Sequence, residues 1–522
     1  MHDILIKNGT ILDGTGKPGY RGDIAIEKDH ISAIGTALGE AKMVIDANEQ
    51  YVAPGFIDIT NHSDVTAAIF QFPSLESMVR QGITTIIGGN CGMSLAPLLT
   101  PDTIHGIRKW APTSAINVNW SSVAELLAEV VKRRPAINFG TMIGHGTLRR
   151  GLTKEESRPL SLEEVLQMKL LIQQGLREGA LGFSTSLGAA HEIHASSEEI
   201  AEIAKVLRSE GGVYKTHLRQ EGTSLISSVN EAIRVVNEAK VPVSISHLKA
   251  IGRQSWPLMR RAIDMIDRTL RGGGKIMYDI SPYATTGSQL YTLLPPWVRD
   301  DGFSAMLSRL RDKNNRDKIL DGLGSLTLHY DRLRISEAED GVSPGRTLQE
   351  LADRGGMDPR ETFLQLLLAN EGRVSIIGRT LHKKNIELGI RGAASVIATN
   401  GSAHDVSIEP KTTLPHPRSF GTFPRFLHHY VVKEKLLSWE EATIKTSSLA
   451  AEFFGIKNRG KILPHYAADI VIFSPDTIRD RATYDNPFLY PDGIRDVLVN
   501  GKVVLAAGAL TGERPGQIIK KL

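Results

Sequence analysis

The sequence predicts an α/β fold: a TIM-like (β/α)8 barrel with a small β-sandwich domain formed by both chain termini and an inserted lid subdomain. In the middle of the chain, short apolar runs alternate with segments of helical periodicity, which is typical of a parallel sheet covered by helices. No GxGxxG follows the first run, which disfavours a doubly wound open sheet. Eight apolar runs are present, as a TIM barrel requires: GFIDITNH, ITTIIGGNC, INFGTMIGH, ALGFSTSL, GVYKTHLR, VPVSISHLK, KIMYDISPY and ASVIATNG.

Both chain ends consist of short β-type runs separated by Gly, Asp and Asn. The N-terminal runs are ILIKNGTIL, GDIAIEK and HISAIGTA, and the C-terminal runs are ADIVIFSP, IRDVLVNG and KVVLAAGAL. Because both ends have the same pattern of short β-type runs and turn residues, we expect them to pair in one composite β-sandwich domain over residues 1–54 and 456–522. The barrel then occupies residues 55–455.

Helical periodicity between the apolar runs is clearest in three segments: SSVAELLAEVVKRR, SLEEVLQMKLLIQQGLREG and SLISSVNEAIRVVNEAK. One connection is far longer than an ordinary loop, since about 110 residues separate KIMYDISPY from ASVIATNG. We expect an inserted subdomain there, over about residues 288–345, at the mouth of the barrel. A strand pair is predicted within it, in SLTLHYDRLRIS.

Composition excludes several classes of protein. The 62 basic and 58 acidic residues of this 522-residue chain nearly balance, with no run of five like charges, so no nucleic-acid partner is expected. No apolar run of 18 residues offers a membrane span, and the polar start MHDILIKNG does not resemble a signal peptide. The single cysteine, Cys91, excludes an internal disulfide and fits a reducing compartment. These features predict a cytoplasmic protein.

Catalytic side chains of TIM barrels lie at the carboxyl ends of the strands. Cys thiolate and neutral His are ligands that Zn²⁺ prefers, and three of them with an open position form a catalytic zinc site. Taken singly, each such residue also fits a buried structural role, so both interpretations stay open at this point. Four histidines and the only cysteine end five of the predicted strands: His62, Cys91, His145, His217 and His247.

At these residues the sequence resembles the N-acyl-D-amino-acid deacylase (D-aminoacylase) family of the amidohydrolase superfamily. The matching segments include VAPGFIDITNHSD, VRQGITTIIGGNCGMSLAP, THLRQEG, ISHLKAIG, SPYATTGSQLYTLLPPW and HPRSFGTFPRFL. GNCGxSxAP and HPRSFGTFPR are specific to that family. The resemblance implies the same barrel and β-sandwich, and hydrolysis by a metal-activated water of the linear amide in N-acylated D-amino acids or related carboxylate-bearing amides.

The resemblance also implies a ligand set and a substrate clamp. One Zn²⁺ per chain would be held by Cys91, His217 and His247. The family's strand-six lysine and strand-seven tyrosine, which bind the substrate carboxylate, match Lys249 and Tyr283. The expected partner is a small N-acyl amino acid-like substrate, with no membrane or nucleic-acid partner and the oligomeric state left open.

Arg379, in an apparent strand before the last barrel unit, is a further candidate for holding an anionic group. The alternative is an ordinary surface arginine.

Two positions depart from the family pattern. The first strand of the superfamily ends in His-x-His, but here Thr60 takes the first position and only His62 remains. The strand-eight Ser-Asp-Gly of the family reads Thr399-Asn400-Gly401, and the amide of Asn400 cannot accept a proton as the aspartate does. A positioned base contributes typically 10²–10⁴-fold to the rate, so the ordinary mechanism lacks a large part of its catalysis.

Three hypotheses address this loss of the base, and one further alternative concerns the substrate. The chemistry has changed to a step whose base is the substrate or the metal-activated water itself, or the chain is a catalytically silent relative that binds a ligand or partner without turnover. A cyclic-amide hydrolase is a weaker alternative, because those relatives hold two metals through His-x-His. Otherwise a neighbouring group replaces the base, and the candidates are Asp405 and Asp64, then His62 and His404, and Glu221.

Overall fold

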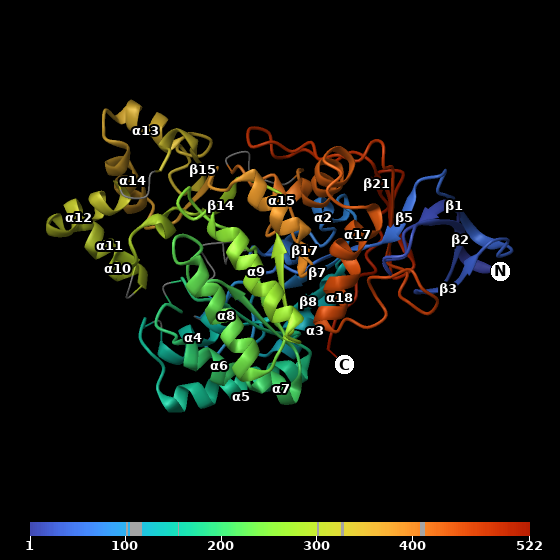
Figure 1. Cartoon of the computed structure of the whole chain (residues 1–522), viewed down its shortest axis with the longest axis horizontal. Helices are drawn as coiled ribbons and strands as arrows, with labels where there is room; N and C mark the ends of the chain where they lie inside the picture. Colours follow the sequence, from blue (N-terminus) through green and yellow to red (C-terminus); the bar gives the residue numbers. More distant parts are fainter. Residues whose placement is uncertain are drawn as a thin grey trace.

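The computed structural model describes residues 1–100, 103–104, 117–154, 156–189, 191–299, 302–324, 328–407 and 413–521. Its centre is a ring of parallel strands in the order β6-β7-β8 and β9-β10-β11-β12-β13-β17 (Figure 1). Strands β8 and β9 follow each other along the chain, and a parallel bridge between Asn61 and Gly401 joins the first strand to the last. The predicted TIM-like barrel is therefore confirmed.

Each barrel strand lies within one of the eight predicted apolar runs, because strands covered on both faces need continuous apolar sequence. Their bounds are β6 Phe56–Asp58, β7 Ile83–Gly88, β8 Asn138–Thr141, β9 Ile143–Gly144, β10 Gly182–Ser186, β11 Val213–His217, β12 Val243–Ile245, β13 Ile276–Ile280 and β17 Ser395–Ile397.

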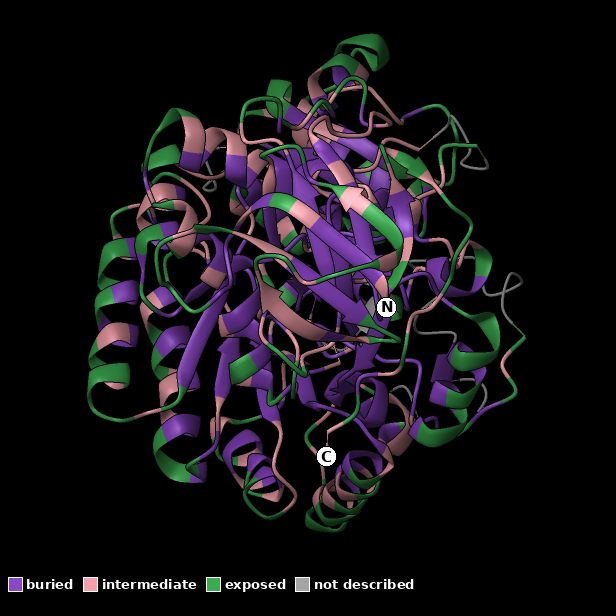
Figure 2. Ribbon diagram, turned by 90° about the vertical axis from the view of Figure 1, so that its right-hand side faces the viewer, coloured by how far each residue is buried: buried purple, intermediate pink, exposed green. Residues whose placement is uncertain are grey.

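The three predicted helices form as α3 (Val123–Arg133), α5 (Leu162–Glu178) and α8 (Leu225–Ala239). Capping boxes at Ser122 and Ser161 start the first two, since each serine accepts from the backbone N–H three residues later. Figure 2 shows buried residues on the inner strands and exposed residues on the outer faces of the helices. The other barrel helices are α1 Ala68–Gln71, α2 Glu76–Val79, α4 His145–Thr153, α6 Ser197–Ala204, α7 Val206–Glu210, α9 Leu258–Arg271, α15 Lys383–Arg391, α16 Arg418–Arg425, α17 Trp439–Thr443 and α18 Leu449–Phe454.

Strands from the two chain ends share one sheet of order β21-β20-β19-β18-β5-β1-β2-β3, with β4 paired to β1. The ends meet where β18 pairs antiparallel with β5. The bounds are β1 His2–Ile11, β2 Tyr20–Glu27, β3 His30–Gly35, β4 Ala41–Asp46, β5 Tyr51–Pro54, β18 Ile470–Phe473, β19 Ile494–Val499, β20 Lys502–Ala506 and β21 Ala509–Leu510.

The long connection after β13 forms a helical segment with its own small sheet, at the opposite end of the long axis from β1–β3 (Figure 1). Its apolar cluster runs from Leu290 to Ile376, so this packing unit extends beyond the boundary expected near residue 345. The bounds are β14 Thr286–Gln289, α10 Pro296–Arg299, α11 Gly302–Arg311, α12 Lys313–Gly324, β15 Leu333–Ala338, α13 Leu348–Gly355, α14 Pro359–Ala369 and β16 Val374–Gly378.

The strand pair predicted in SLTLHYDRLRIS falls partly outside the described residues. Residues 325–327 of that segment lie outside the described residues, and Tyr330–Arg332 form a 3-10 turn. Within the described part of the segment β15 is the strand, and its partner is β16, about 40 residues further along the chain. Local alternation cannot reveal a strand partner that is so distant in sequence.

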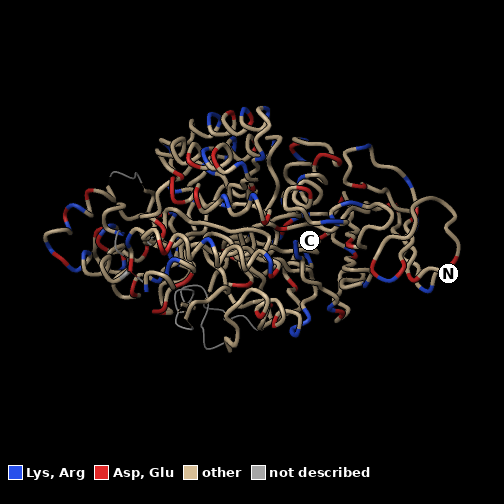
Figure 3. Tube along the Cα trace, turned by 90° about the horizontal axis from the view of Figure 1, so that it is seen from below, with Lys and Arg blue, Asp and Glu red and all other residues tan. Residues whose placement is uncertain are grey.

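Charged residues of both signs are interspersed along the whole trace (Figure 3), as the balanced composition predicts. Within the described ranges, none of the helices combines the length and the apolar character needed to cross a bilayer.

A buried carboxylate ties the first barrel strand to the last. Asp58 of β6 accepts hydrogen bonds from Asn61 Nδ2 at 2.8 Å, from the backbone N of Thr399 at 2.9 Å and from Thr399 Oγ1 at 2.5 Å. Burial raises the pKa of Asp58 to about 6, against these hydrogen bonds. The hydrogen bonds fix the strand ends from which His62 and Asn400 project.

Replacing Asp58 with Ala should lower the free energy of unfolding by about 2–4 kcal/mol, because buried donors lose their acceptor. Thermal unfolding followed by circular dichroism measures the change. Asp3→Ala is the control, since the Asp3 carboxylate pairs with Lys42 at the surface and should alter stability little. Equal destabilisation by the two substitutions would contradict the role given to Asp58.

Candidate metal centre

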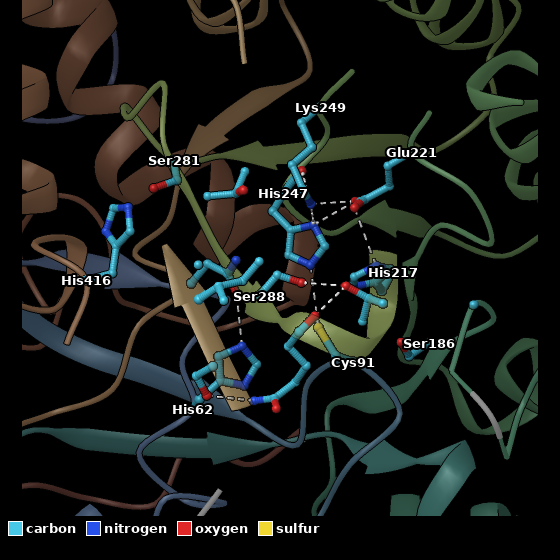
Figure 4. A pocket seen from close by; sticks show the side chains of 18 of the residues that line it. His62, Cys91, Ser186, His217, Glu221, His247, Lys249, Ser281, Ser288 and His416 are labelled. Atoms are coloured by element: carbon cyan, nitrogen blue, oxygen red, sulfur yellow. Dashed lines mark hydrogen bonds and ion pairs between the residues drawn. The ribbon is translucent and has the colours of Figure 1, made fainter. Parts of the chain in front are cut away.

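Three side chains that zinc binds well meet at the carboxyl ends of barrel strands. Cys91 follows β7, His217 ends β11 and His247 follows β12, and their ligand atoms all lie within 4.8 Å of one another. Cys91 Sγ is 3.6 Å from His247 Nε2, and the two imidazole rings pack edge to face with centroids 4.5 Å apart. Figure 4 shows the three side chains pointing toward one another. This three-ligand set, with a fourth position open, is the pattern of catalytic zinc sites.

Burial sets the protonation of these groups. It lowers the pKa of His217 and, together with the nearby Lys249 charge, lowers that of His247 to about 3. Both rings are therefore neutral, the form that binds a metal. Burial also raises the pKa of Cys91 to about 12. The thiol is thus protonated at neutral pH, and metal binding would have to displace its proton.

The backbone is strained at this site. Cys91, His247 and Asn400 have φ angles of 54°, 37° and 49°, in the left-handed region that residues other than glycine rarely adopt. Such conformations cost about 1–3 kcal/mol each and cluster at functional sites. Three of them around one centre indicate that its geometry is maintained against the local backbone preference.

The centre lies in a cavity of about 900 Å³, within the size range of small-molecule sites. Most of the cavity wall comes from the loops that follow the barrel strands, but Tyr291 and Leu333 belong to the inserted segment. The insert therefore contributes part of the wall above the centre.

Glu221 lies behind the histidines. Its Oε1 is 3.2 Å from His247 Nδ1 and 2.5 Å from Lys249 Nζ, and its other oxygen is 3.6 Å from His217 Nε2. Burial acts to raise the pKa of Glu221, but the Lys249 charge beside it is the main effect that holds the pKa below its ordinary value. Lys249 Nζ also lies 2.8 Å from His247 Nδ1, so Glu221 and Lys249 together orient this ring with Nε2 toward Cys91 Sγ, as outer groups orient metal-binding histidines.

Of the four residues predicted for catalysis, two lie in the cavity and touch each other. His62 Nε2 is 2.9 Å from Asn400 Oδ1, although 338 positions separate them in sequence. Burial lowers the pKa of His62 to about 4, so the ring is neutral. A neutral imidazole that donates Nε2–H to the amide oxygen keeps Nδ1 as its basic nitrogen.

The structure does not bring Asp64 or Asp405 to the cavity. Asp64 is buried beneath β7, where its carboxylate accepts the backbone N–H of Gly89 at 2.6 Å. Asp405 turns back on its own loop and accepts from the backbone N and the hydroxyl of Ser407, at 2.9 and 2.6 Å. His404 does line the cavity and stacks on Phe420. Although Asp405 is close to Asn400 in sequence, its carboxylate does not line the cavity.

His145, the fourth histidine at a strand end, lies outside the three-ligand cluster. Its Nδ1 is 2.7 Å from Glu192 Oε2, and its Nε2 is 3.4 Å from Glu199 Oε1. Arg149 also pairs with Glu199, at 2.5 Å. His145 therefore belongs to a buried ion-pair network.

Of the three residues predicted to bind substrate, two line the cavity and one does not. Lys249 and Tyr283 both line the cavity, and Arg425 stacks on the Tyr283 ring with its guanidinium carbon 4.8 Å from the ring centroid. Arg379 is exposed and does not line the cavity, although its neighbours Gly378 and Thr380 do. Side chains alternate along an extended segment, which turns Arg379 outward.

With this geometry established, comparison with known proteins shows the family. The model described as "Amidohydrolase family" matches residues 43–505. The chain belongs to the amidohydrolase family. A D-aminoacylase from Alcaligenes xylosoxydans xylosoxydans is 30% identical over 99% of this chain and 98% of its own length.

Solved structures give the same result for this amidohydrolase. The N-acyl-D-glutamate deacylase of Bordetella bronchiseptica, complexed with zinc and a phosphonate mimic of the tetrahedral intermediate, is 28% identical, has a TM-score of 0.84 and covers 100% of both chains. A D-aminoacylase studied for the role of its binuclear metal centre is 29% identical, with a TM-score of 0.85 and the same coverage. The protein is thus a hydrolase of carbon–nitrogen bonds other than peptide bonds, and its predicted resemblance is confirmed.

Sequence analysis of this amidohydrolase missed Arg418. Its guanidinium lines the cavity, and no acidic side chain in the described part of the chain pairs with it. Burial lowers the pKa of Arg418 to about 10, so it is still charged at neutral pH. The available signal was the motif HPRSFGTFPR: its first arginine is Arg418, and its second, Arg425, pairs with Asp480 at 3.0 Å behind Tyr283.

Proposed function

We propose that the protein is a deacylase of N-acyl-D-amino acids that works with one zinc ion. One observation carries the proposal: Cys91, His217 and His247 converge on the floor of a cavity whose wall carries Lys249 and Arg418. A metal ligand set beside two cations fits a substrate with an amide to be cleaved and a carboxylate to be held. The named activities of the similar proteins support this substrate class.

The donor set fits zinc. One buried thiol and two neutral imidazoles are borderline-soft ligands, and Glu221 stands behind His247 as an outer carboxylate. When bound, zinc would polarise the amide carbonyl and lower the pKa of water to about 7. Among the described residues, Cys91, His217 and His247 are the ones that we assign to it.

The substrate carboxylate is assigned to Lys249, Tyr283 and Arg418. Arg418 replaces Arg379 in this role, because the Arg379 side chain is exposed outside the cavity. A guanidinium and an ammonium placed around one carboxylate give charge-assisted hydrogen bonds that fix the substrate's orientation. Tyr283 is itself held between Arg425 and the ring of His416.

Replacing Arg418 with Met should raise KM for an N-acetyl-D-amino acid about 10–100-fold, since a hydrogen bond to a charged group contributes about 1.5–3 kcal/mol. Initial-rate kinetics measure it. Arg379→Met removes the same charge outside the cavity and should leave KM unchanged. If Arg379→Met raised KM as much, the carboxylate would be held elsewhere.

His62 is assigned as the proton acceptor in place of the usual aspartate. It is neutral, lines the cavity and is held by Asn400, which presents an amide oxygen to Nε2–H. Nδ1 would then take the proton from water and return it to the leaving amine. Asn400 acts as a positioning residue in this scheme.

Cys91 also indicates the kind of cellular compartment in which the protein works. Because the site needs a free thiolate, we propose that the protein works in a reducing compartment such as the cytoplasm.

The test measures zinc per chain by elemental analysis and assays the same sample against N-acyl-D- and N-acyl-L-amino acids. One zinc with turnover of the D series is expected. One zinc without turnover on any substrate would favour the silent, ligand-binding alternative. Absence of zinc from a protein purified without chelators and reloaded with zinc would overturn the proposal.

A further inference from the structure

A lysine is buried in the barrel directly below the metal centre. Lys215 lies on β11, and its side chain is fully buried. Its Nζ donates to Asp279 Oδ2 of β13 at 2.7 Å and to Thr60 Oγ1, just after β6, at 2.6 Å. The Thr60 hydroxyl in turn donates to Asp279 Oδ2 at 2.6 Å. The three side chains form a closed, buried triangle across the barrel.

This triangle is adjacent to the candidate metal centre. Lys215 and His217 are two residues apart on β11, so their side chains point to the same face, and Thr60 precedes His62 by two residues just after β6. Asp279 Oδ1 accepts the backbone N–H of His247 at 2.8 Å. The ammonium therefore lies one layer below the ligands, inside the ring of strands that carries them.

The charges of the triangle act on the residues above it. Burial raises the pKa of Cys91, and the Lys215 ammonium is the strongest charge opposing that rise. Lys215 also contributes to the low pKa of His62. Asp279 remains ionised: burial acts to raise its pKa, but the Lys215 charge together with the hydrogen bonds from Lys215 and Thr60 lowers it below its ordinary value.

Among the described residues, Thr60, His62 and Asn400 stand at the second-metal positions and supply no carboxylate. Thr60, which stands where the superfamily has its first strand-one histidine, uses its hydroxyl proton on Asp279. His62 and Asn400 hydrogen-bond to each other. A second divalent ion would find no carboxylate here to balance its charge, because Asp279 is already paired with the Lys215 ammonium.

We propose that the Lys215 ammonium takes the place of a second metal ion, neutralising Asp279 and limiting the centre to one zinc. The D-aminoacylase with a binuclear centre is described as activated by one metal and attenuated by the second. This chain would not be attenuated in that way. The Lys215 ammonium cannot dissociate, and it already neutralises the buried Asp279 carboxylate. The inference rests on the proposed zinc site of Cys91, His217 and His247.

The test compares zinc content in three proteins under excess zinc. The wild type should bind one zinc per chain. The double variant Thr60→His with Asn400→Asp restores the histidine and the carboxylate that the family has at these positions but keeps Lys215. It should also bind one zinc per chain. Adding Lys215→Met should raise the count to two. Elemental analysis after removal of loosely bound metal gives the count, and the absorption spectrum of the cobalt-loaded proteins distinguishes the thiolate site from a second site without thiolate.

A second zinc on the wild type or on the Thr60→His, Asn400→Asp protein would overturn the inference, as would one zinc on a folded protein with all three substitutions. If that protein did not fold, the other two would still decide the question. Excess zinc should also leave the wild-type rate unchanged. A wild type without zinc would instead overturn the proposed metal site, which distinguishes that failure from failure of the charge argument.

Discussion

Replacing Cys91 with Ala should abolish both zinc binding and hydrolysis. Cys91 supplies the only thiolate of the three-ligand set, and the remaining imidazoles of His217 and His247 leave an open, two-ligand site. Loss of an outer carboxylate alone typically lowers metal affinity about 10–100-fold, so loss of a direct ligand should exceed that range. Zinc content and initial rate, measured on the same dialysed sample, check the prediction.

Glu221→Gln provides a graded comparison for this experiment. It removes the carboxylate charge behind His247 but leaves all three ligands in place. Zinc affinity should fall by about 10–100-fold, and excess zinc should restore most of the rate. A Cys91→Ala protein that retained one zinc per chain and the full rate would contradict the proposed centre.

Replacing His62 with Ala should lower kcat by about 10²–10⁴-fold at unchanged zinc content, which is the usual contribution of a positioned base. The physical reason is that His62 is the neutral, basic side chain in contact with Asn400. Single-turnover rates and zinc analysis of one preparation separate loss of the base from loss of the metal.

Asp405→Asn is the matched control for His62, because Asp405 does not line the cavity and its carboxylate bonds to Ser407. Its kcat should equal that of the wild type. Asn400→Asp added to the His62→Ala protein should recover part of the rate, since a carboxylate can accept the proton that the amide cannot. A large loss of kcat in Asp405→Asn would assign the base to that residue instead.

Much of this architecture follows from local sequence. The eight apolar runs became the eight strand positions of the barrel because buried parallel strands need continuous apolar sequence. The family motifs placed Cys91, His217 and His247 at strand ends, and parallel strands bring such ends together on one face. The same argument placed Lys249 and Tyr283 in the cavity.

Predictions that depended on side-chain direction were less successful. Arg379 and Asp405 are adjacent in sequence to cavity residues, yet one side chain is exposed and the other bonds to its own loop. Arg418 was missed, although its motif was recognised. Within one loop, a change of a single residue reverses the side-chain direction, and periodicity does not record it.

By itself, the sequence determined the barrel, its composite terminal strands and the types of ligand available to a metal, because these depend on local patterning and on the rule that parallel strand ends converge. Only the tertiary structure decided that His62 meets Asn400 and that Lys215, Thr60 and Asp279 close a buried triangle. Those contacts join strands far apart in the chain, where packing and charge balance across the barrel select the partners.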